Sequence, residues 1–306
     1  MRIGINGSSL IAIGSSADAV AAHAGEADRD GFATYWVAQL IWPDALTHIA
    51  AVGSSTESIR FGTAVVPTWP RHPLMLASQA LTTSHVVGGR LTLGIGLAHK
   101  VMVEEVYRVP FTTPAKHMRE YLDVLLPAME SRSADADGDI WSANLESFGV
   151  AEGTTAPSVM LAAMGPRMLE LAGSRTDGTI LWLSGPRAVE SEIAPTLRSA
   201  AESAGRSAPQ IVASVPVCVT DKPDEVREVV AGVLANYNEL PSYRRMMDIE
   251  GVDGPANVSL IGTGSEVLAG LERYASAGVT EFSALEFTTN DAEAADTRAL
   301  LREYNS

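Results

Sequence analysis

The sequence has a single cysteine, Cys218, among its 306 residues. One cysteine excludes an internal disulfide and a cysteine-based metal site, and it fits a reducing compartment, so we expect a cytoplasmic protein. Cys218 lies in the strand-like run VPVCVT, which predicts a small, buried, hydrophobic side chain. The thiol is therefore expected to pack in the core.

Basic residues are also scarce: 22 lysines and arginines stand against 37 aspartates and glutamates, for a formal net charge of −15. Nucleic acids and anionic membranes bind clustered positive charge, so this balance argues against both as partners. Every apolar run is broken well before the roughly 18 residues that a membrane span needs. Met1 leads directly into the strand-like RIGIN, so we expect no targeting segment. These absences leave a small molecule as the expected partner.

Several well-known catalytic signatures are absent. The sequence contains no H-E-x-x-H, no G-x-S-x-G and no Walker-type P-loop. The run GIGLAH, residues 94–99, lacks the third glycine of a dinucleotide fingerprint, which argues against a Rossmann site. No convincing cluster of metal-ligating side chains is present either, so we expect no metal.

The most distinctive stretch of the sequence lies between residues 157 and 182. Ser158–Ala163 is an apolar run without polar alternation, which predicts a buried strand. Gly165-Pro166 ends this strand, and Arg167–Ala172 has the spacing of a helix that Gly173 closes. Gly178–Trp182 then begins another strand. Such a unit presents free backbone N–H groups at a helix N-terminus, where an anionic phosphate is favoured. The alternative is an ordinary turn that binds nothing.

Strand-like and helix-like segments alternate along almost the whole chain. About eight repeats predict a (β/α)8 TIM barrel, and a doubly wound open sheet is the alternative. The other predicted strands are Arg2–Asn6, Ala33–Val37, Arg60–Val66, Leu91–Ile95, Ile211–Thr220, the short Val258–Ile261 and Val279–Phe287. The other predicted helices are Ser15–Arg29, Asp44–Gly53, His72–Val87, Ala115–Glu130, Arg187–Gly205, Asp224–Asn236, Ser265–Ala277 and Ala292–Tyr304.

Two stretches break this alternation. Residues 131–156 are polar and contain IWSANLESFGV, a segment that can form a hairpin, and residues 237–256 have the pattern of a helical excursion. Neither stretch is large enough to bury a core of its own. We therefore expect both to be insertions on a single barrel domain that spans residues 1–306.

Four strand-end segments carry a resemblance to a known family. They read GFATYWVAQLIWPD (31–44), FGTAVVPTWPRHP (61–73), GGRLTLGIGLAHK (88–100) and AAMGPRMLELAGSRTDG (162–178). In this order and spacing they resemble the luciferase-like monooxygenase superfamily, most closely its deazaflavin-dependent reductase branch, similar to the methylenetetrahydromethanopterin reductases. The resemblance implies a barrel with an insertion after strand seven, usually a homodimer, with coenzyme F420 at the carboxyl ends of the strands. FMN is the alternative cofactor.

The resemblance also implies where the cofactor lies. The bond Ala64-Val65 falls where these reductases carry a non-prolyl cis peptide behind the deazaflavin ring, and residues 165–168 match their phosphate-binding turn. Gln39 stands where many relatives have an acid or a histidine. It can hydrogen-bond the deazaflavin edge but cannot transfer a proton, which argues against oxidation of sugar phosphates. The full predicted cofactor-binding set is Gln39, Thr63, Ala64, Val65, Gly96, His99, Ala163, Met164, Gly165, Pro166, Arg167 and Met168.

His99 is the preferred candidate for proton transfer, because histidine titrates near neutrality and the preceding Gly-Ile-Gly places it at the barrel mouth. A structural histidine is the alternative. Glu104, in the same loop, can supply an acid if burial raises its pKa, whereas a solvated acidic face is the simpler interpretation. Arg71 or Lys100 is expected to form a basic rim for the acidic tail of the coenzyme. The predicted substrate pocket comprises Trp42, Trp69, His72 and Trp182.

We therefore expect an F420-dependent oxidoreductase that transfers a hydride between C5 of the reduced deazaflavin and an organic substrate, with a C=N or C=C bond as the acceptor. One alternative is an FMN-dependent monooxygenase of a two-component system. The other is a non-catalytic deazaflavin-binding protein, an interpretation kept open by the glutamine at position 39.

Overall fold

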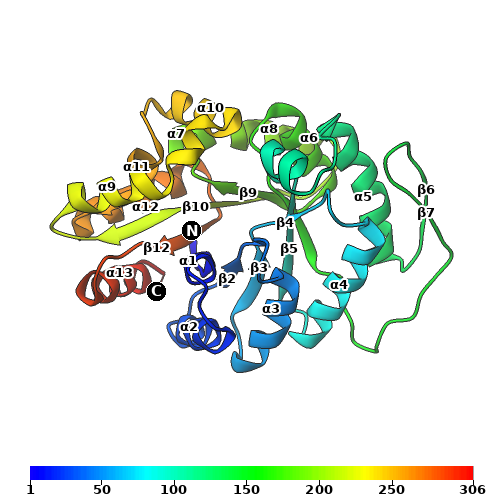
Figure 1. Ribbon diagram of the computed structural model, residues 1–306, viewed down its shortest axis with the longest axis horizontal. Coiled ribbons are helices and arrows are strands. Elements are labelled where there is room, and N and C mark those ends of the chain that lie inside the picture. Colours follow the sequence, from blue (N-terminus) through cyan, green and yellow to red (C-terminus); the bar gives the residue numbers. More distant parts are fainter. Residues whose placement is uncertain (306) are drawn as a thin grey trace.

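The computed structural model describes residues 1–305. Eight parallel strands close into a barrel, in which β12 pairs with β1 and β9 pairs with β10 (Figure 1). In order around the barrel, these strands are β1 (Arg2–Asn6), β2 (Thr34–Val37), β3 (Arg60–Thr63), β5 (Leu91–Gly96), β8 (Ser158–Leu161), β9 (Gly178–Trp182), β10 (Gln210–Val219) and β12 (Glu281–Glu286). The predicted (β/α)8 TIM barrel is confirmed, because an open doubly wound sheet would leave two unpaired edges.

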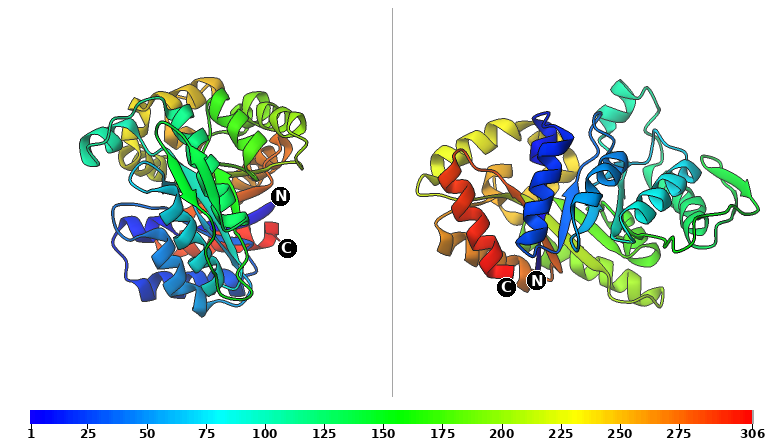
Figure 2. Two further views of the ribbon diagram at one scale, coloured as in Figure 1. Left: turned by 90° about the vertical axis from the view of Figure 1, so that its right-hand side faces the viewer. Right: turned by 90° about the horizontal axis from the view of Figure 1, so that it is seen from below.

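Helices surround the barrel, and both chain ends lie close together on one side of it (Figure 2). Within residues 1–305, the helices of eight or more residues are α2 (Ala17–Arg29), α3 (Ala45–Val52), α4 (Pro73–Val86), α5 (Pro114–Glu130), α6 (Pro166–Arg175), α8 (Ala194–Ser203), α9 (Pro223–Val233), α10 (Pro241–Glu250), α12 (Gly264–Ala277) and α13 (Asp291–Asn305). Several begin at a side-chain cap that the sequence supplies. Thr263 forms a capping box with Glu266, for example, and the carboxylate of Asp44 accepts the amide proton of Thr47.

Trp36 fills the barrel interior toward the amino ends of the strands. Its indole lies between Gly4 and Gly62, where a Cβ would come within 3.0 Å and 2.3 Å of ring atoms respectively. The indole Nε1 donates to Oε1 of the buried Glu281 at 2.8 Å, and Arg2 forms an ion pair with the other carboxylate oxygen. The amino end of the barrel is therefore closed by packed and paired groups.

The two stretches that break the alternation have regular structure of their own. Within residues 131–156, β6 (Ala134–Asp137) pairs antiparallel with β7 (Ser142–Leu145), and this hairpin projects beside α5 (Figures 1 and 2). Between β10 and β12 lie the 3-10 helix η4 (Ala235–Glu239), α10 (Pro241–Glu250) and α11 (Pro255–Val258). The strand β11 (Leu260–Gly262) then adds to β10. The second stretch thus follows the seventh barrel strand.

The structure corrects some predicted boundaries. Gly173 does not end its helix, because α6 continues to Arg175, and a Cβ at Gly173 would lie 2.3 Å from the carbonyl oxygen of Leu197 in α8. This glycine instead permits two helices to cross closely. The predicted strand Arg60–Val66 is interrupted after Thr63, and the short β4 (Val66–Pro67) pairs with β5.

Other corrections concern short elements. The predicted extended segment Val258–Ile261 is split, because Val258 ends α11 and β11 begins at Leu260. The predicted helix Arg187–Gly205 consists of α7 (Pro186–Ala188), the π-helical turn η3 (Val189–Ile193) and α8. The sequence did not reveal α1 (Ser8–Ala12), the 3-10 turn η1 (Gly53–Ser55) or the π-helical turn η2 (Met102–Val106).

Candidate active site

A bulge at the carboxyl end of β3 forms one wall of the candidate site. The peptide bond Ala64-Val65 is cis, as the resemblance implied. Thr63, which is fully buried, bridges the gap that the bulge opens between β3 and β5. Its hydroxyl donates to the carbonyl of Gly94 at 2.7 Å and accepts the Gly94 amide proton at 2.8 Å. A hydroxyl therefore replaces a backbone pair where the sheet is interrupted.

Two glycines of β5 make room for this bulge. A Cβ at Gly94 would lie 1.9 Å from the carbonyl oxygen of Thr63. A Cβ at Gly96 would lie 2.7 Å from Cγ2 of Val65 and 3.2 Å from Cβ of Ala162. The bulge, β5 and the end of β8 are thus in contact at one place, and no side chain separates them.

The turn after β8 presents an open helix N-terminus. Gly165 is the N-cap of α6 with φ −96° and ψ 154°, and Pro166 follows it at the first helical position. The carbonyl of Gly165 accepts from the amides of Met168 and Leu169. The amides of Gly165 and Arg167 have no acceptor within residues 1–305, and a Cβ at Gly165 would meet nothing within 4 Å. Unpartnered N–H groups at a helix N-terminus favour an anion.

A second turn with the same sequence lies at the end of the neighbouring strand. Gly185-Pro186-Arg187 follows β9 as Gly165-Pro166-Arg167 follows β8, and its N-cap glycine has a similar conformation, with φ −77° and ψ 166°. Here Oε2 of Glu250 accepts the amide protons of Arg187 at 2.9 Å and Ala188 at 3.1 Å. The protein therefore contains one such turn occupied by its own carboxylate and one that is free.

Thr179 holds the free turn in place from β9. Its buried hydroxyl accepts the amide proton of Ala163 at 3.2 Å. The hydroxyl proton can reach the carbonyl of Leu161 at 2.8 Å or that of Ala163 at 3.2 Å. The β8–β9 ladder pairs Leu161 with Thr179, and the hydroxyl of Thr179 adds a tie to the backbone just after β8.

His99 lies against an aromatic cluster that comes from two parts of the chain. Its ring makes edge contacts with Tyr237 at 5.9 Å and Tyr243 at 5.7 Å between centroids. Tyr237 in turn contacts Tyr243 and Trp182. Burial lowers the pKa of His99, which favours a neutral imidazole at pH 7. Two sequence-predicted residues, His99 and Trp182, are therefore brought together by tyrosines that sequence reasoning did not single out.

Comparison with known proteins identifies the family. Residues 4–281 match the model of the luciferase-like monooxygenase family. The chain belongs to this family.

Relatives and solved structures agree with this membership. A Mycobacterium tuberculosis protein named as a coenzyme F420-dependent oxidoreductase is 34% identical over 178 residues, covering 53% of this chain and 50% of the relative. The 5,10-methylenetetrahydromethanopterin reductase of Archaeoglobus fulgidus is 31% identical over 135 residues, covering 44% and 40%. The chain thus spans half or less of these two relatives.

The fold extends over the whole chain. The coenzyme F420-dependent tetrahydromethanopterin reductase of Methanopyrus kandleri has a TM-score of 0.77 at 19% identity, covering 100% of this chain and 97% of that one. The oxygenating constituent of 3,6-diketocamphane monooxygenase from Pseudomonas putida, solved with FMN, has a TM-score of 0.79 at 18% identity, covering 99% and 97%. At these identities the likeness concerns the fold.

Gln39 is engaged within its own loop in this member of the luciferase-like family. Its Oε1 accepts the amide proton of Ala45 at 2.8 Å, and its Nε2 donates to the carbonyl of Leu40 at 2.8 Å. The loop also contains the cis bond Trp42-Pro43. A contact with the cofactor edge, as predicted for Gln39, would have to replace these bonds.

The predicted acid, Glu104, and the predicted rim residues, Arg71 and Lys100, all form ion pairs within the protein. Glu104 is partly exposed and forms an ion pair with Lys100 at 3.7 Å, so it is not the buried carboxyl that the sequence argument requires. Arg71 forms an ion pair with Asp44. A carboxylate partly offsets the charge of each cation, and the basic rim at Arg71 or Lys100 stays a prediction. Arg167 is exposed and forms no ion pair within the part of the chain that the structure describes.

The predicted pocket residues lie in different surroundings. Trp42 is 64% exposed, and His72 is exposed as the N-cap of α4. Trp69 is buried and stacks on His117 with 3.7 Å between ring centroids. Trp69 is therefore part of a packed cluster. Trp182 contacts Tyr237, which in turn contacts His99.

His117 is a buried packing residue, in agreement with its helical position. Trp141 of the hairpin donates to its Nδ1 at 3.1 Å, so the ring proton lies on Nε2 and points to the hydroxyl of Thr68 at 2.8 Å. Burial lowers the pKa of His117 to about 4. Cys218 is likewise buried, and this burial raises the pKa of its thiol to about 12.

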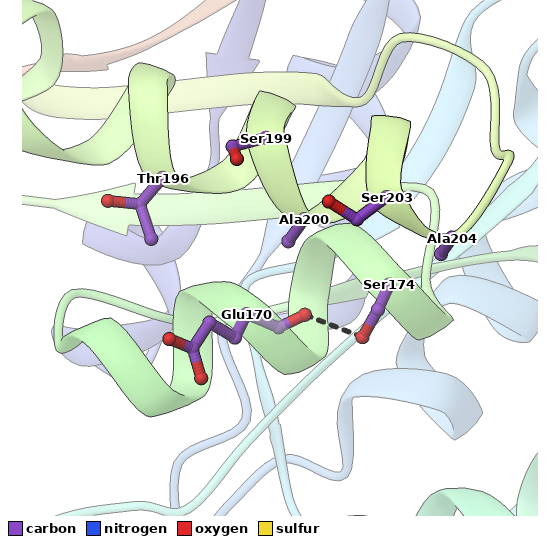
Figure 3. Close-up of a pocket in the computed structure, with 7 residues that line it drawn as sticks. All are labelled: Glu170, Ser174, Thr196, Ser199, Ala200, Ser203 and Ala204. Carbon is purple, nitrogen blue, oxygen red and sulfur yellow. Dashed lines mark hydrogen bonds between the residues drawn. The ribbon is translucent and has the colours of Figure 1, made fainter.

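Other candidate sites are less developed. No group of three or more metal-binding side chains occurs in residues 1–305, and no helix there is long and apolar enough to cross a membrane. Figure 3 shows a groove on the outside of the barrel between α6 and α8, lined by Glu170, Ser174, Thr196, Ser199, Ala200, Ser203 and Ala204. Small residues and one carboxylate line it, and Ser174 bonds within α6. This groove offers no counterpart to the free amides at Gly165.

Proposed function

We propose that the protein is a coenzyme F420-dependent oxidoreductase that transfers a hydride between the deazaflavin and an organic substrate. The proposal is carried by the free Gly165-Pro166-Arg167 turn, which joins the Ala64-Val65 bulge through Ala162 and Gly96. An anion on the turn and a flat ring against the bulge are the two demands of a phosphate-bearing deazaflavin. The names of the relatives from Mycobacterium tuberculosis and Archaeoglobus fulgidus support the choice of F420.

The residues present fit such a cofactor. The amides of Gly165 and Arg167 would hold its phosphate, and the side chain of Arg167 adds an unpaired positive charge beside them. Ala64, Val65 and Gly96 would support the ring, with Ala163, Met164, Pro166 and Met168 around the turn. When bound, reduced F420 supplies a hydride from C5 of its ring.

His99 would handle the proton. Because burial keeps its imidazole neutral, His99 can donate a hydrogen bond to the acceptor atom or accept a proton from an alcohol-like substrate. In the direction of reduction, the proton that completes the reaction would then come from water through the ring. We propose a C=N or C=C bond as the acceptor, and Trp182 as the wall of the substrate side beside His99.

FMN-dependent oxygenation is the second candidate. It is favoured by the likeness of the fold to an FMN-bound monooxygenase, and the free turn could equally hold the terminal phosphate of FMN. The glutamine at position 39, bonded within its loop, leaves a non-catalytic deazaflavin-binding role as the third outcome.

A paired titration separates these functions. Intrinsic fluorescence is followed against F420 and, separately, against FMN, and each loaded protein is then tested with imines and enones and for oxygen uptake. Tight F420 binding with turnover of an imine or enone supports the proposal. Preference for FMN with oxygen uptake supports a monooxygenase, and F420 binding without turnover of any acceptor supports a carrier. A homodimer in the cytoplasm, as the resemblance and the single cysteine suggest, is proposed alongside and tested by sedimentation and fractionation.

A further inference from the structure

The helix α10 lies outside the barrel but contacts the candidate site. Tyr243, near its first turn, is buried and contacts the ring of His99 at 5.7 Å. Met247 is fully buried in a cluster that also includes Leu183 at the end of β9 and, at its edge, Met164 of the free turn. The position of α10 therefore sets how His99 is covered.

One residue at the end of α10 fixes this helix to the barrel. Glu250 lies seven residues after Tyr243, two helical turns along the same side. Its carboxylate oxygen Oε2 takes both amides at the start of α7, from Arg187 and Ala188. The fit is close, because a Cβ at Gly185 would lie 2.3 Å from Cδ of Glu250. A methyl group at Gly185 would therefore displace the carboxylate from the amides.

A second contact supports the same attachment. Arg245 of α10 forms an ion pair with Glu192 of the π-helical turn η3. The other charged pair of α10 behaves differently, because Arg244 bonds Asp248 within the helix and the carbonyls of Val252 and Asp253 just after it. Beside the buried Tyr243 and Met247, the polar attachment of α10 to the barrel thus comes from Glu250 and Arg245, whereas Asp248 bonds within the helix.

We propose that Glu250 is a positioning residue: its carboxylate, seated on the second Gly-Pro-Arg turn, holds α10 so that Tyr243 covers His99. The chain thereby uses one of two similar turns as an internal anion-binding site, and leaves the other to a ligand. The catalytic role of His99 rests on the proposed function. The attachment of α10 by Glu250 does not, because it is present in the protein without any ligand.

The test measures His99 directly. Histidine labelled with 13C is titrated by NMR, and the His99 signal is assigned with the His99→Gln variant. Glu250→Ala removes the carboxylate, and Gly185→Ala pushes it from its seat without changing any charge. Both should raise the pKa of His99 toward the ordinary value of 6.5, because water reaches the ring once Tyr243 moves away. Both should also increase the rate at which diethyl pyrocarbonate modifies His99.

Two further variants make the result decisive. Glu250→Gln keeps an acceptor oxygen, so it should restore much of the wild-type titration. Asp248→Asn makes the same change of charge on the same helix without touching α7, so His99 should titrate as in the wild type. If Glu250→Ala does not fold, Gly185→Ala and Glu250→Gln still give the answer. Unchanged titration of His99 in folded Gly185→Ala and Glu250→Ala proteins would overturn the proposal, whether or not the wild type binds F420.

Discussion

Replacing Thr179 by valine removes one hydroxyl and keeps the shape of the side chain. In the wild type this buried hydroxyl accepts the amide proton of Ala163 and donates to one of two carbonyls at the end of β8. Without it, the Ala163 amide is left in the interior with no acceptor, which costs about 1 to 3 kcal/mol, and one further hydrogen bond worth about 1 kcal/mol is lost. We therefore expect Thr179→Val to lower the free energy of unfolding by about 2 to 4 kcal/mol.

The same change should weaken cofactor binding, because Ala163 leads directly into the free turn at Gly165. In the variant, part of the binding free energy of F420 must be used to order this turn. If that part is about 1.4 kcal/mol, the affinity for F420 falls about tenfold. Urea unfolding followed by circular dichroism measures the first effect, and fluorescence titration with F420 measures the second. Thr179→Ser keeps the hydroxyl and should restore both.

Thr297→Val is the matched control. Thr297 is also fully buried, and its hydroxyl accepts the amide proton of Val219 at 2.8 Å, at the end of β10 and not of β8. This variant should lose similar stability while binding F420 like the wild type. If Thr179→Val and Thr297→Val bind F420 equally well, the hydroxyl of Thr179 serves only the fold and the reasoning about the turn is refuted.

Three other outcomes follow from the structure. Gly165→Ala should fold with unchanged stability, because the new methyl meets no atom within 4 Å. It should bind F420 at least about tenfold more weakly in the same titration, because the methyl would enter the space proposed for the phosphate. Gly94→Ala should lose about 4 kcal/mol or fail to fold, since its Cβ would lie 1.9 Å from a backbone oxygen, whereas Gly149→Ala, with open space around it, should unfold like the wild type. The buried His117 binds a proton only near pH 4 in the folded state but near pH 6.5 in the unfolded chain, so stability present above pH 6.5 should fall by about 3 kcal/mol as the pH drops from 6.5 to 4. His117→Gln should remove that part of the pH dependence in urea unfolding, and an equal slope in both proteins would contradict the assignment.

The barrel could be predicted because most of its strands are short apolar runs followed by a segment with helical spacing. Burial on both sides makes such runs visible without an alignment. The bend after Thr63 could not be read from the same pattern, since a cis bond and a broken ladder leave the sequence apolar throughout. Only the resemblance to the family located it.

The candidate site was predictable where it depends on neighbouring residues and not where it depends on distant ones. The turn at Gly165-Pro166 can be predicted from these two adjacent residues alone, and in the structure they lie at the N-terminus of α6. Arg71 pairs with Asp44, which lies far from it in the sequence, so this ion pair could not be read from spacing, whereas the pair of Lys100 with Glu104 has the i,i+4 spacing that a helix favours. Tyr243 reaches His99 from far along the chain. The repeated Gly-Pro-Arg was the one available signal of this link.

The closure of the amino end of the barrel restricts how ligands can move. Trp36, with Glu281 and Arg2 beneath it, fills the amino end of the barrel interior. Two ligands that react within the barrel must therefore use one opening, and they cannot exchange places inside it. The ligand that lies against the bulge must enter before its reaction partner and can leave only after it. If the protein is the F420-dependent oxidoreductase proposed above, steady-state kinetics should accordingly show a compulsory order, with F420 binding first and departing last.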